Sequence, residues 1–140
     1  MDIGNIFEVT VERRNLLIGV IWIFVFLILG FFIEMQVIST QETWKQGAYH
    51  GLFKAAYVFG ITFGILNILY ALIIRNYSLQ GDKMIRVGSL LAFIAAFLLP
   101  VSLFLGAFER ALMVGAPVGG IIMIIAYGVL ALSFIKNSSK

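Results

Sequence analysis

Four long apolar segments, each separated from the next by a short polar connection, constrain this chain more than any other feature. They cover residues 16–33, 52–74, 87–107 and 116–135. Each is close to the roughly 20 residues that an α-helix needs to cross a hydrocarbon core of about 30 Å. Of the 17 charged residues, 16 lie outside these segments, and Lys54 is the exception. The pattern predicts a single domain, residues 1–140, built of four membrane-spanning helices.

Composition excludes several classes of protein. Hydrophobic residues make up 61% of the chain and charged residues 12%, against about 45–50% and about 25% in soluble domains. A soluble enzyme is therefore excluded, and so is a disordered chain, because the apolar content is high and the net charge is only +3. The absence of cysteine excludes disulfide scaffolds, Cys-ligated zinc and thiol nucleophiles. Exposed strand edges are not tolerated in lipid, so the predicted fold class is all-α.

The connections between segments have 18, 12 and 8 residues, which favours a four-helix transmembrane bundle with up-down-up-down topology. Cytoplasmic loops of membrane proteins are enriched in Lys and Arg, and one side of the predicted bundle has seven of these residues against three on the other. Both termini are therefore expected in the cytoplasm of a multi-pass protein, in a prokaryotic cell (inner) membrane. The seven are Arg13, Arg14, Arg75, Lys83, Arg86, Lys136 and Lys140, and the three are Lys45, Lys54 and Arg110.

Two segments contain small residues at helical spacing, which let the backbone of another helix approach closely. We interpret these stripes as packing between helices of this chain, with an interface to another chain as the alternative. Gly60 and Gly64 form a GxxxG motif, and the stripe on segment 116–135 is expected to pack against the stripe on segment 52–74. The first stripe comprises Ala56, Gly60, Gly64, Asn67 and Ala71, and the second comprises Ala116, Gly120, Ile124 and Gly128.

Segment 87–107 contains a proline, Pro100. A proline inside a helix removes one hydrogen bond and leaves the carbonyl group four residues earlier, that of Ala96, without its donor. We expect a neighbouring helix or Ser102 to compensate, as membrane proteins commonly arrange. A kink toward the outer half of the helix is also expected, and it is interpreted as shape fitting in preference to a gating hinge.

Ionisable residues collect at the outer ends of the predicted helices, where up-down topology brings them to one level. Such residues at membrane depth are functional candidates. The structural interpretation is that Lys54 reaches the interface or pairs with Glu34 or Glu109. The alternatives are a proton or small-solute site in which His50 titrates, and a haem site with His50 as one axial ligand and a partner supplying the second. The outer cluster comprises Glu34, His50, Lys54, Tyr57, Glu109 and Arg110.

No set of catalytic groups can be assembled from the sequence, which has no Ser/His/Asp triad and no HExxH motif, so the chain is not expected to be an enzyme. A single histidine without cysteine also argues against a metal centre owned by this chain alone. We predict a non-catalytic accessory or structural subunit, or an assembly helper, of a larger membrane complex, whose partners are the lipid bilayer and other membrane subunits. Nucleic acid is not an expected partner, because the basic residues serve orientation and contact with anionic headgroups.

Two alternative functions remain open at this point. The first is a small homo-oligomeric transporter or channel with an outer-side site at His50, Lys54 and a glutamate. Few polar residues lie within the apolar segments to line such a path. The second alternative is haem or quinone binding through His50, together with a partner redox subunit. The polar mid-span residues are Thr62, Asn67, Ser89, Ser102 and Tyr127.

The predicted topology places Asp82 and Glu109 on opposite sides of the membrane. Because the chain has no native cysteine, the variants Asp82→Cys and Glu109→Cys react only at the new residue. A membrane-impermeant maleimide applied to intact cells is expected to label Glu109→Cys at once, and Asp82→Cys only after the membrane is opened. Equal labelling of both variants in intact cells contradicts this topology.

Overall fold

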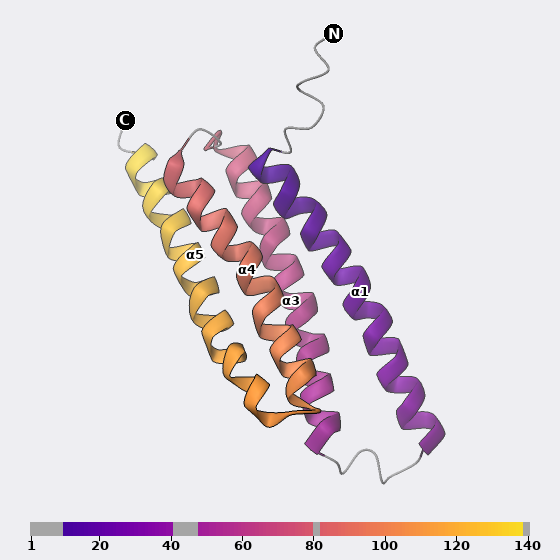
Figure 1. Cartoon of the computed structure of the whole chain (residues 1–140). Helices are drawn as coiled ribbons and strands as arrows, with labels where there is room; N and C mark the ends of the chain where they lie inside the picture. The colour runs from indigo at the N-terminus through magenta and orange to yellow at the C-terminus, as the bar shows by residue number, and fades with distance from the viewer. Residues whose placement is uncertain (1–9, 41–47, 80–81, 139–140) are drawn as a thin grey trace, which may run out of the picture.

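Four long α-helices and one short 3-10 helix make up the part of the chain that the computed structural model describes, residues 10–40, 48–79 and 82–138 (Figure 1). All four long helices are long and apolar enough to cross a membrane, so the chain is an all-α, multi-pass membrane protein. Lys45 and Lys140, two of the residues that set the predicted orientation, lie outside the described residues. The helices are α1 (Val11–Thr40), α3 (Ala48–Asn76), α4 (Lys83–Gly106), η2 (Arg110–Val114) and α5 (Gly115–Ser138).

The turn between α3 and α4 is defined by local capping on both sides. Asp82 is the N-cap of α4, and its side chain accepts a hydrogen bond from the backbone N–H of Met84 at 2.9 Å, as N-cap residues commonly do. At the end of α3, Ser78 adopts a left-handed φ of 52°, and the N–H of Leu79 donates to the carbonyl of Ile74 at 3.0 Å. This is a Schellman-type ending. Leu79 and Ile74 are both buried, so apolar packing supports the same turn.

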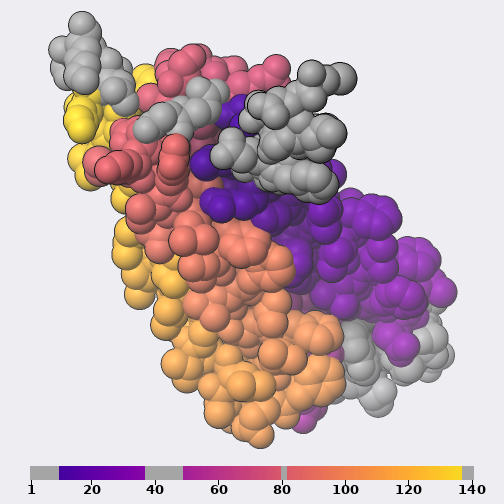
Figure 2. Space-filling model, turned by 45° about the horizontal axis from the view of Figure 1, so that its top comes forward, coloured from indigo at the N-terminus to yellow at the C-terminus, as the bar shows by residue number. Residues whose placement is uncertain are grey.

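The four helices are arranged around a central pair, α3 and α4. α1 packs mainly on α3 and α5 mainly on α4, so that α1 and α5 lie along opposite edges of the molecule (Figure 1, Figure 2). The first turn of α1, the last turn of α5 and the turn between α3 and α4 lie at the same end (Figure 1). We call this the terminal end, and we call the other end, which holds η2 and the first turn of α3, the loop end.

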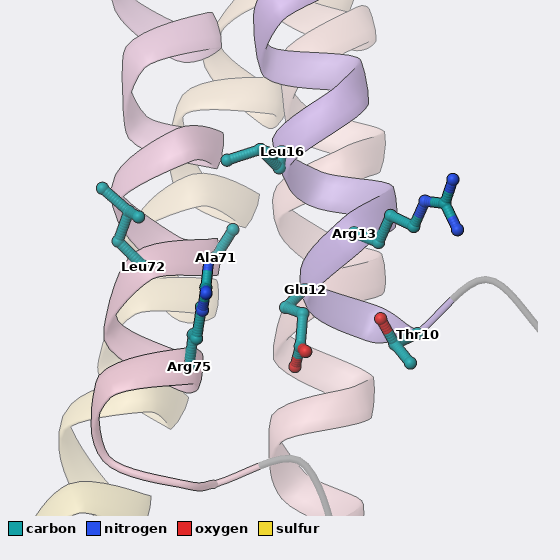
Figure 3. A pocket seen from close by; sticks show the side chains of 7 residues that line it. All are labelled: Thr10, Glu12, Arg13, Leu16, Ala71, Leu72 and Arg75. Carbon is teal, nitrogen blue, oxygen red and sulfur yellow. The ribbon is translucent and has the colours of Figure 1, made fainter.

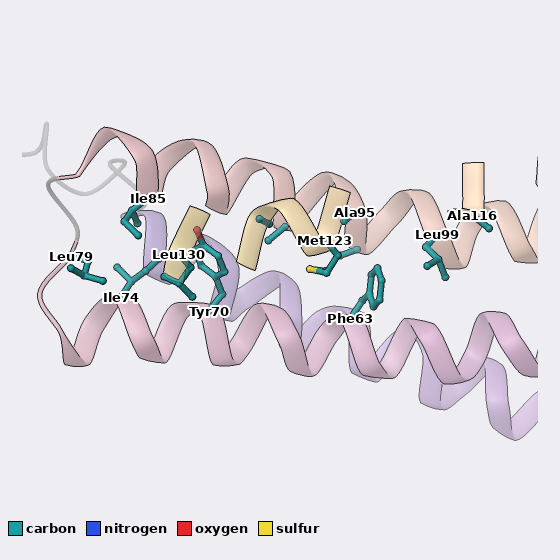
Figure 4. Packing of buried hydrophobic residues seen from close by; sticks show 13 residues of the cluster. Phe63, Tyr70, Ile74, Leu79, Ile85, Ala95, Leu99, Ala116, Met123 and Leu130 are labelled. Carbon is teal, nitrogen blue, oxygen red and sulfur yellow. The ribbon is translucent and has the colours of Figure 1, made fainter. Parts of the chain in front are cut away.

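Buried apolar side chains fill the space between α3, α4 and α5 (Figure 4). Ala92, Ala95 and Ala96 of α4 are fully buried, and their small size allows the neighbouring helices to approach closely. α1 takes little part in this core, because only 22% of its membrane-spanning stretch is buried, against 50% of the membrane-spanning stretch of α4. The outward face of α1 is therefore available to lipid or to another protein.

α1 is held close to α3 at glycine positions. A Cβ atom at Gly19 would lie 2.6 Å from the carbonyl oxygen of Gly64, and one at Gly64 would lie 2.9 Å from the carbonyl oxygen of Gly19. A backbone oxygen cannot rotate aside as a flexible side chain can, so any side chain at these positions would push the helices apart. Gly60 lies against the ring of Phe26 of α1. Gly60 and Gly64 thus face α1.

The expected pairing of the two small-residue stripes is therefore wrong. Ile124 is 73% exposed, and a Cβ atom at Gly128 would meet no atom within 4 Å. Each four-residue step turns a side chain by about 40° around a helix. After three such steps, Gly128 lies about 120° around α5 from Ala116. Gly120, one step from Ala116, lies only at the edge of the contact with α4.

α5 packs on α4 through residues that alternate three- and four-residue steps, a spacing that stays on one face. Gly119 takes the place that was expected for Gly120. A Cβ atom at Gly119 would lie 2.7 Å from the backbone nitrogen of Leu99 in α4. The buried face of α5 comprises Ala116, Gly119, Met123, Ala126, Leu130 and Ser133.

The carbonyl group that Pro100 deprives of its donor obtains one from another helix. α4 continues through the buried Pro100. The indole Nε1–H of Trp22 in α1 donates to the carbonyl oxygen of Ala96 at 2.6 Å, and the Trp22 ring packs on Phe97 with centroids 4.0 Å apart. The expected compensation by a neighbouring helix is thus present, whereas the expected kink stays a prediction.

The glycine contact between α1 and α3 predicts different outcomes for the same substitution at two positions. Gly19→Ala places a methyl group against the Gly64 carbonyl and should lower the free energy of unfolding by about 1–3 kcal/mol, the usual cost of overpacking. Gly128→Ala meets open space and should be neutral, or stabilising by up to about 1 kcal/mol, because alanine favours helix over glycine. Thermal or chemical unfolding in a mild detergent measures both, and equal effects would contradict the packing.

Candidate functional site

The outer cluster predicted from the sequence lies at the loop end, where its side chains mostly face outward. Glu34, Lys54, Glu109 and Arg110 are exposed and His50 is half-buried. Among the described residues, Lys54 forms no ion pair with Glu34 or Glu109. The interpretation in which the ammonium group of Lys54 reaches the interface stays a prediction. A ligand site shared by this cluster stays a prediction.

Glu109 and Tyr57 of the outer cluster have local structural contacts. Glu109 is the N-cap of η2, and its carboxylate accepts from the backbone N–H of Ala111 at 3.4 Å. The ring of Tyr57 covers Gly30 of α1, because a Cβ atom at Gly30 would collide with it. Within the described residues, no group of three or more His, Asp or Glu side chains is placed to hold a metal ion.

A buried polar cluster lies instead toward the terminal end, between α1 and α4. Ser89 of α4 donates through its hydroxyl to Oδ1 of Asn15 at 2.7 Å. The same hydroxyl oxygen accepts from Nη2 of Arg14 at 2.9 Å. Asn15 and Ser89 are completely buried. These bonds join the edge helix α1 to α4, with which it has few other close contacts.

Two further side chains connect the remaining helices by hydrogen bonds to backbone carbonyls. Asn67 of α3 donates from Nδ2 to the carbonyl of Phe63 in its own helix at 2.9 Å and to that of Ala92 in α4 at 3.3 Å. Tyr127 of α5 donates to the carbonyl of Leu66 in α3 at 2.5 Å. In hydrocarbon such bonds hold helices together at about 0.6–2 kcal/mol each.

Tyr70 of α3 completes the polar interior. It is fully buried, and its ring meets that of Tyr127 edge-on with centroids 5.7 Å apart. Its hydroxyl group lies against Gly88 of α4, where any Cβ atom would collide with it. Gly88 is therefore required by the tyrosine that it faces. The residue before Ser89 is thus small because Tyr70 occupies the space.

Several polar atoms of this interior are buried and have no hydrogen-bond partner in the protein. They are Nδ2 of Asn15, Nε of Arg14, Oδ1 of Asn67 and the hydroxyl of Tyr70. Buried polar atoms in folded proteins almost always have partners, either from the protein or from ordered water. The Asn15–Ser89 cluster and its neighbours are therefore a polar interior suited to a few water molecules.

Sequence reasoning found part of this interior. Ser89, Asn67 and Tyr127 stood out as polar residues inside apolar segments. Asn15 did not, because it lies one residue before the apolar segment 16–33, and Tyr70 has no pattern that sets it apart from the other aromatic residues of segment 52–74. The roles of Asn15 and Tyr70 depend on the residues of other helices that they contact, and the sequence does not show which residues these are.

Comparisons with known proteins supply no family and no relative. No protein-family model, no curated protein and no solved structure matches this chain. Its function is therefore inferred from the geometry of its own residues, and the polar interior is the candidate site that the helices place together.

The Asn15–Ser89 cluster predicts a specific loss of stability. Ser89→Ala removes the partner of both Asn15 and Arg14 and should lower the free energy of unfolding by about 1–3 kcal/mol, because buried polar groups are left unpaired. The control is Thr62→Val, which also removes one hydroxyl group. Thr62 is exposed and bonds only to Val58 of its own helix at 2.8 Å, so its loss should change stability little. Equal effects in detergent unfolding would argue against the cluster.

Proposed function

We propose that this small integral membrane protein is a non-catalytic accessory or structural subunit, or an assembly helper, of a larger membrane complex. It lies in a prokaryotic cell membrane with both termini in the cytoplasm, the orientation favoured by the excess of basic residues near the terminal end. The proposal is supported by what the bundle does with its polar side chains and by the surfaces that it leaves uncovered.

The observation that carries the proposal is that the polar side chains inside the bundle connect helices to one another. Trp22, Asn67 and Tyr127 each donate to a backbone carbonyl of a different helix. Two further side-chain hydrogen bonds join α1 to α4. Toward the loop end, aromatic rings contribute to the helix contacts, with Phe53 packed on Phe104 and Phe108. This arrangement favours a rigid bundle over a polar path across the membrane.

The outward faces of the two edge helices are broad and apolar. On α1, Phe24 is 64% exposed, and on α5, Ile124 is 73% exposed. Lipid covers such faces in an isolated membrane protein, and a neighbouring transmembrane helix covers them in a complex. α1 and α5 lie along opposite edges of the molecule (Figure 2). In the proposed complex, each of the two faces is covered by a neighbouring subunit.

No specific feature of the described residues favours the two alternative functions. A homo-oligomeric transporter or channel that uses the outer cluster would need Glu34, Lys54 and Glu109, which are exposed in the single chain, to face a polar path shared between copies. Haem or quinone binding through His50 would need a partner subunit in any case. Both alternatives therefore become outcomes of the purification experiment.

The accessory role predicts that unlike chains co-purify with this protein at a fixed ratio. A tagged copy purified in mild detergent should retain one or more different membrane proteins, identified and counted by native mass spectrometry. The matched variants Ile21→Trp on α1 and Ile124→Trp on α5 enlarge exposed side chains, which should leave the fold intact. Loss of a partner from one variant identifies the edge that it covers.

A preparation containing only copies of this chain would contradict the accessory role and favour the homo-oligomeric transporter. In that case His50→Ala should abolish a proton-coupled flux in proteoliposomes. A coloured complex whose Soret absorbance falls in His50→Ala would favour haem binding. The unfolding behaviour of each variant serves as the control for its fold.

A further inference from the structure

A cleft of about 340 Å³ opens between the first turns of α1 and the last turns of α3, at the terminal end (Figure 3). Its rim is polar and includes Glu12 of α1 and Arg75 of α3. Its inner wall is apolar, formed by Leu16, Ala71 and Leu72. The cleft is therefore charged at one end and apolar at the other.

The polar rim contains a carboxylate oxygen that lacks a partner in the protein. Oε2 of Glu12 is buried and accepts no hydrogen bond. Glu12 and Arg75 both line the cleft, yet they form no ion pair with each other within the described residues. Leaving a buried carboxylate oxygen without a donor is costly. Rotation of the carboxyl group exchanges its two oxygens, so the Glu12 carboxylate, which lines the cleft, is suited to a donor that comes from outside the chain.

The depth of the cleft matches the boundary between hydrocarbon and headgroups. Glu12 lies four residues before the apolar segment 16–33, and Arg75 directly follows the segment 52–74. One turn of helix rises about 5.4 Å, so both charges lie within about one turn of the hydrocarbon. Leu16 and Leu72 are partly exposed beside them, at the depth of the first acyl carbons.

We propose that this cleft binds a phospholipid whose headgroup carries both a phosphate and a primary ammonium group. The guanidinium of Arg75 binds the phosphate, as arginine does at basic membrane pockets. The ammonium group donates to the carboxylate of Glu12, and an acyl chain lies along Leu16 and Leu72. Arg13 also lines the cleft, but its guanidinium points away from α3 (Figure 3), so Arg75 is the principal cation.

Glu12 determines which lipid headgroup the cleft prefers. A purely anionic headgroup would satisfy Arg75 and leave the Glu12 oxygen without a donor. A choline headgroup carries no N–H group and cannot donate to it either. An ethanolamine headgroup supplies three N–H donors next to its phosphate and satisfies both residues. This site serves lipid binding whether or not the chain also belongs to a larger complex.

The test is the binding of single lipids to the full chain in a neutral detergent, followed by native mass spectrometry. Phosphatidylethanolamine, phosphatidylcholine and phosphatidylglycerol with matched acyl chains are compared. We expect ethanolamine lipid to bind about tenfold more tightly than choline lipid, the contribution of one charge-assisted hydrogen bond. Inorganic phosphate alone should neither bind nor raise the unfolding temperature.

Three variants separate the contributions. Glu12→Gln should remove most of the preference for ethanolamine over choline lipid, because the amide carries no negative charge. Arg75→Gln should weaken both lipids to a similar extent, because the phosphate is common to them. Arg86→Gln changes an exposed basic residue of α4 that does not line the cleft, and binding should be unchanged. Unfolding temperatures of all three confirm that each variant folds.

Several results would overturn the proposal. Equal affinity of the wild-type protein for ethanolamine and choline lipids would show that Glu12 does not select the headgroup. Tighter binding of phosphatidylglycerol than of phosphatidylethanolamine would replace the zwitterionic lipid by an anionic one. Stabilisation by inorganic phosphate alone would identify a soluble anion as the ligand. None of these results bears on the co-purification of other subunits, so the two proposals fail independently.

Discussion

Inside a hydrocarbon layer every backbone polar group must find its partner within the protein, and this bundle depends on that constraint. Pro100 leaves the carbonyl of Ala96 without its helical donor, and Trp22 of α1 supplies one. Asn67 reaches a carbonyl of α4 and Tyr127 reaches one of α3. Each bond joins a different pair of helices, which in lipid cannot rely on the burial of apolar surface for their association.

The same constraint explains why the two ends of the bundle differ. Arg14, Asn15, Ser89 and Tyr70 gather toward the terminal end, where water and headgroups are near. Toward the loop end, rings such as those of Phe53 and Phe104 fill the helix contacts. This difference between the two ends is one of the observations that support the proposed structural role.

The proposed lipid site and the proposed accessory role are compatible because they use different surfaces. The lipid cleft lies at the seam between α1 and α3, whereas the apolar faces available to other subunits lie on the outer sides of α1 and α5. A headgroup held by Glu12 and Arg75 would join the first turn of α1 to the last turn of α3. α1 is the least buried helix, so it has the most to gain from such a contact.

The sequence by itself determined the four helices, because apolarity and charge are properties of each segment alone. It also determined that Ala96 would need a donor, since the effect of proline is local. Which faces meet depends on how each helix is rotated against its neighbours, and only the tertiary structure decided this. It placed Gly119 at the α5 interface and turned Gly128 outward. It also joined Asn15 to Ser89, although 74 positions separate them in the chain, and it formed the cleft between Glu12 and Arg75.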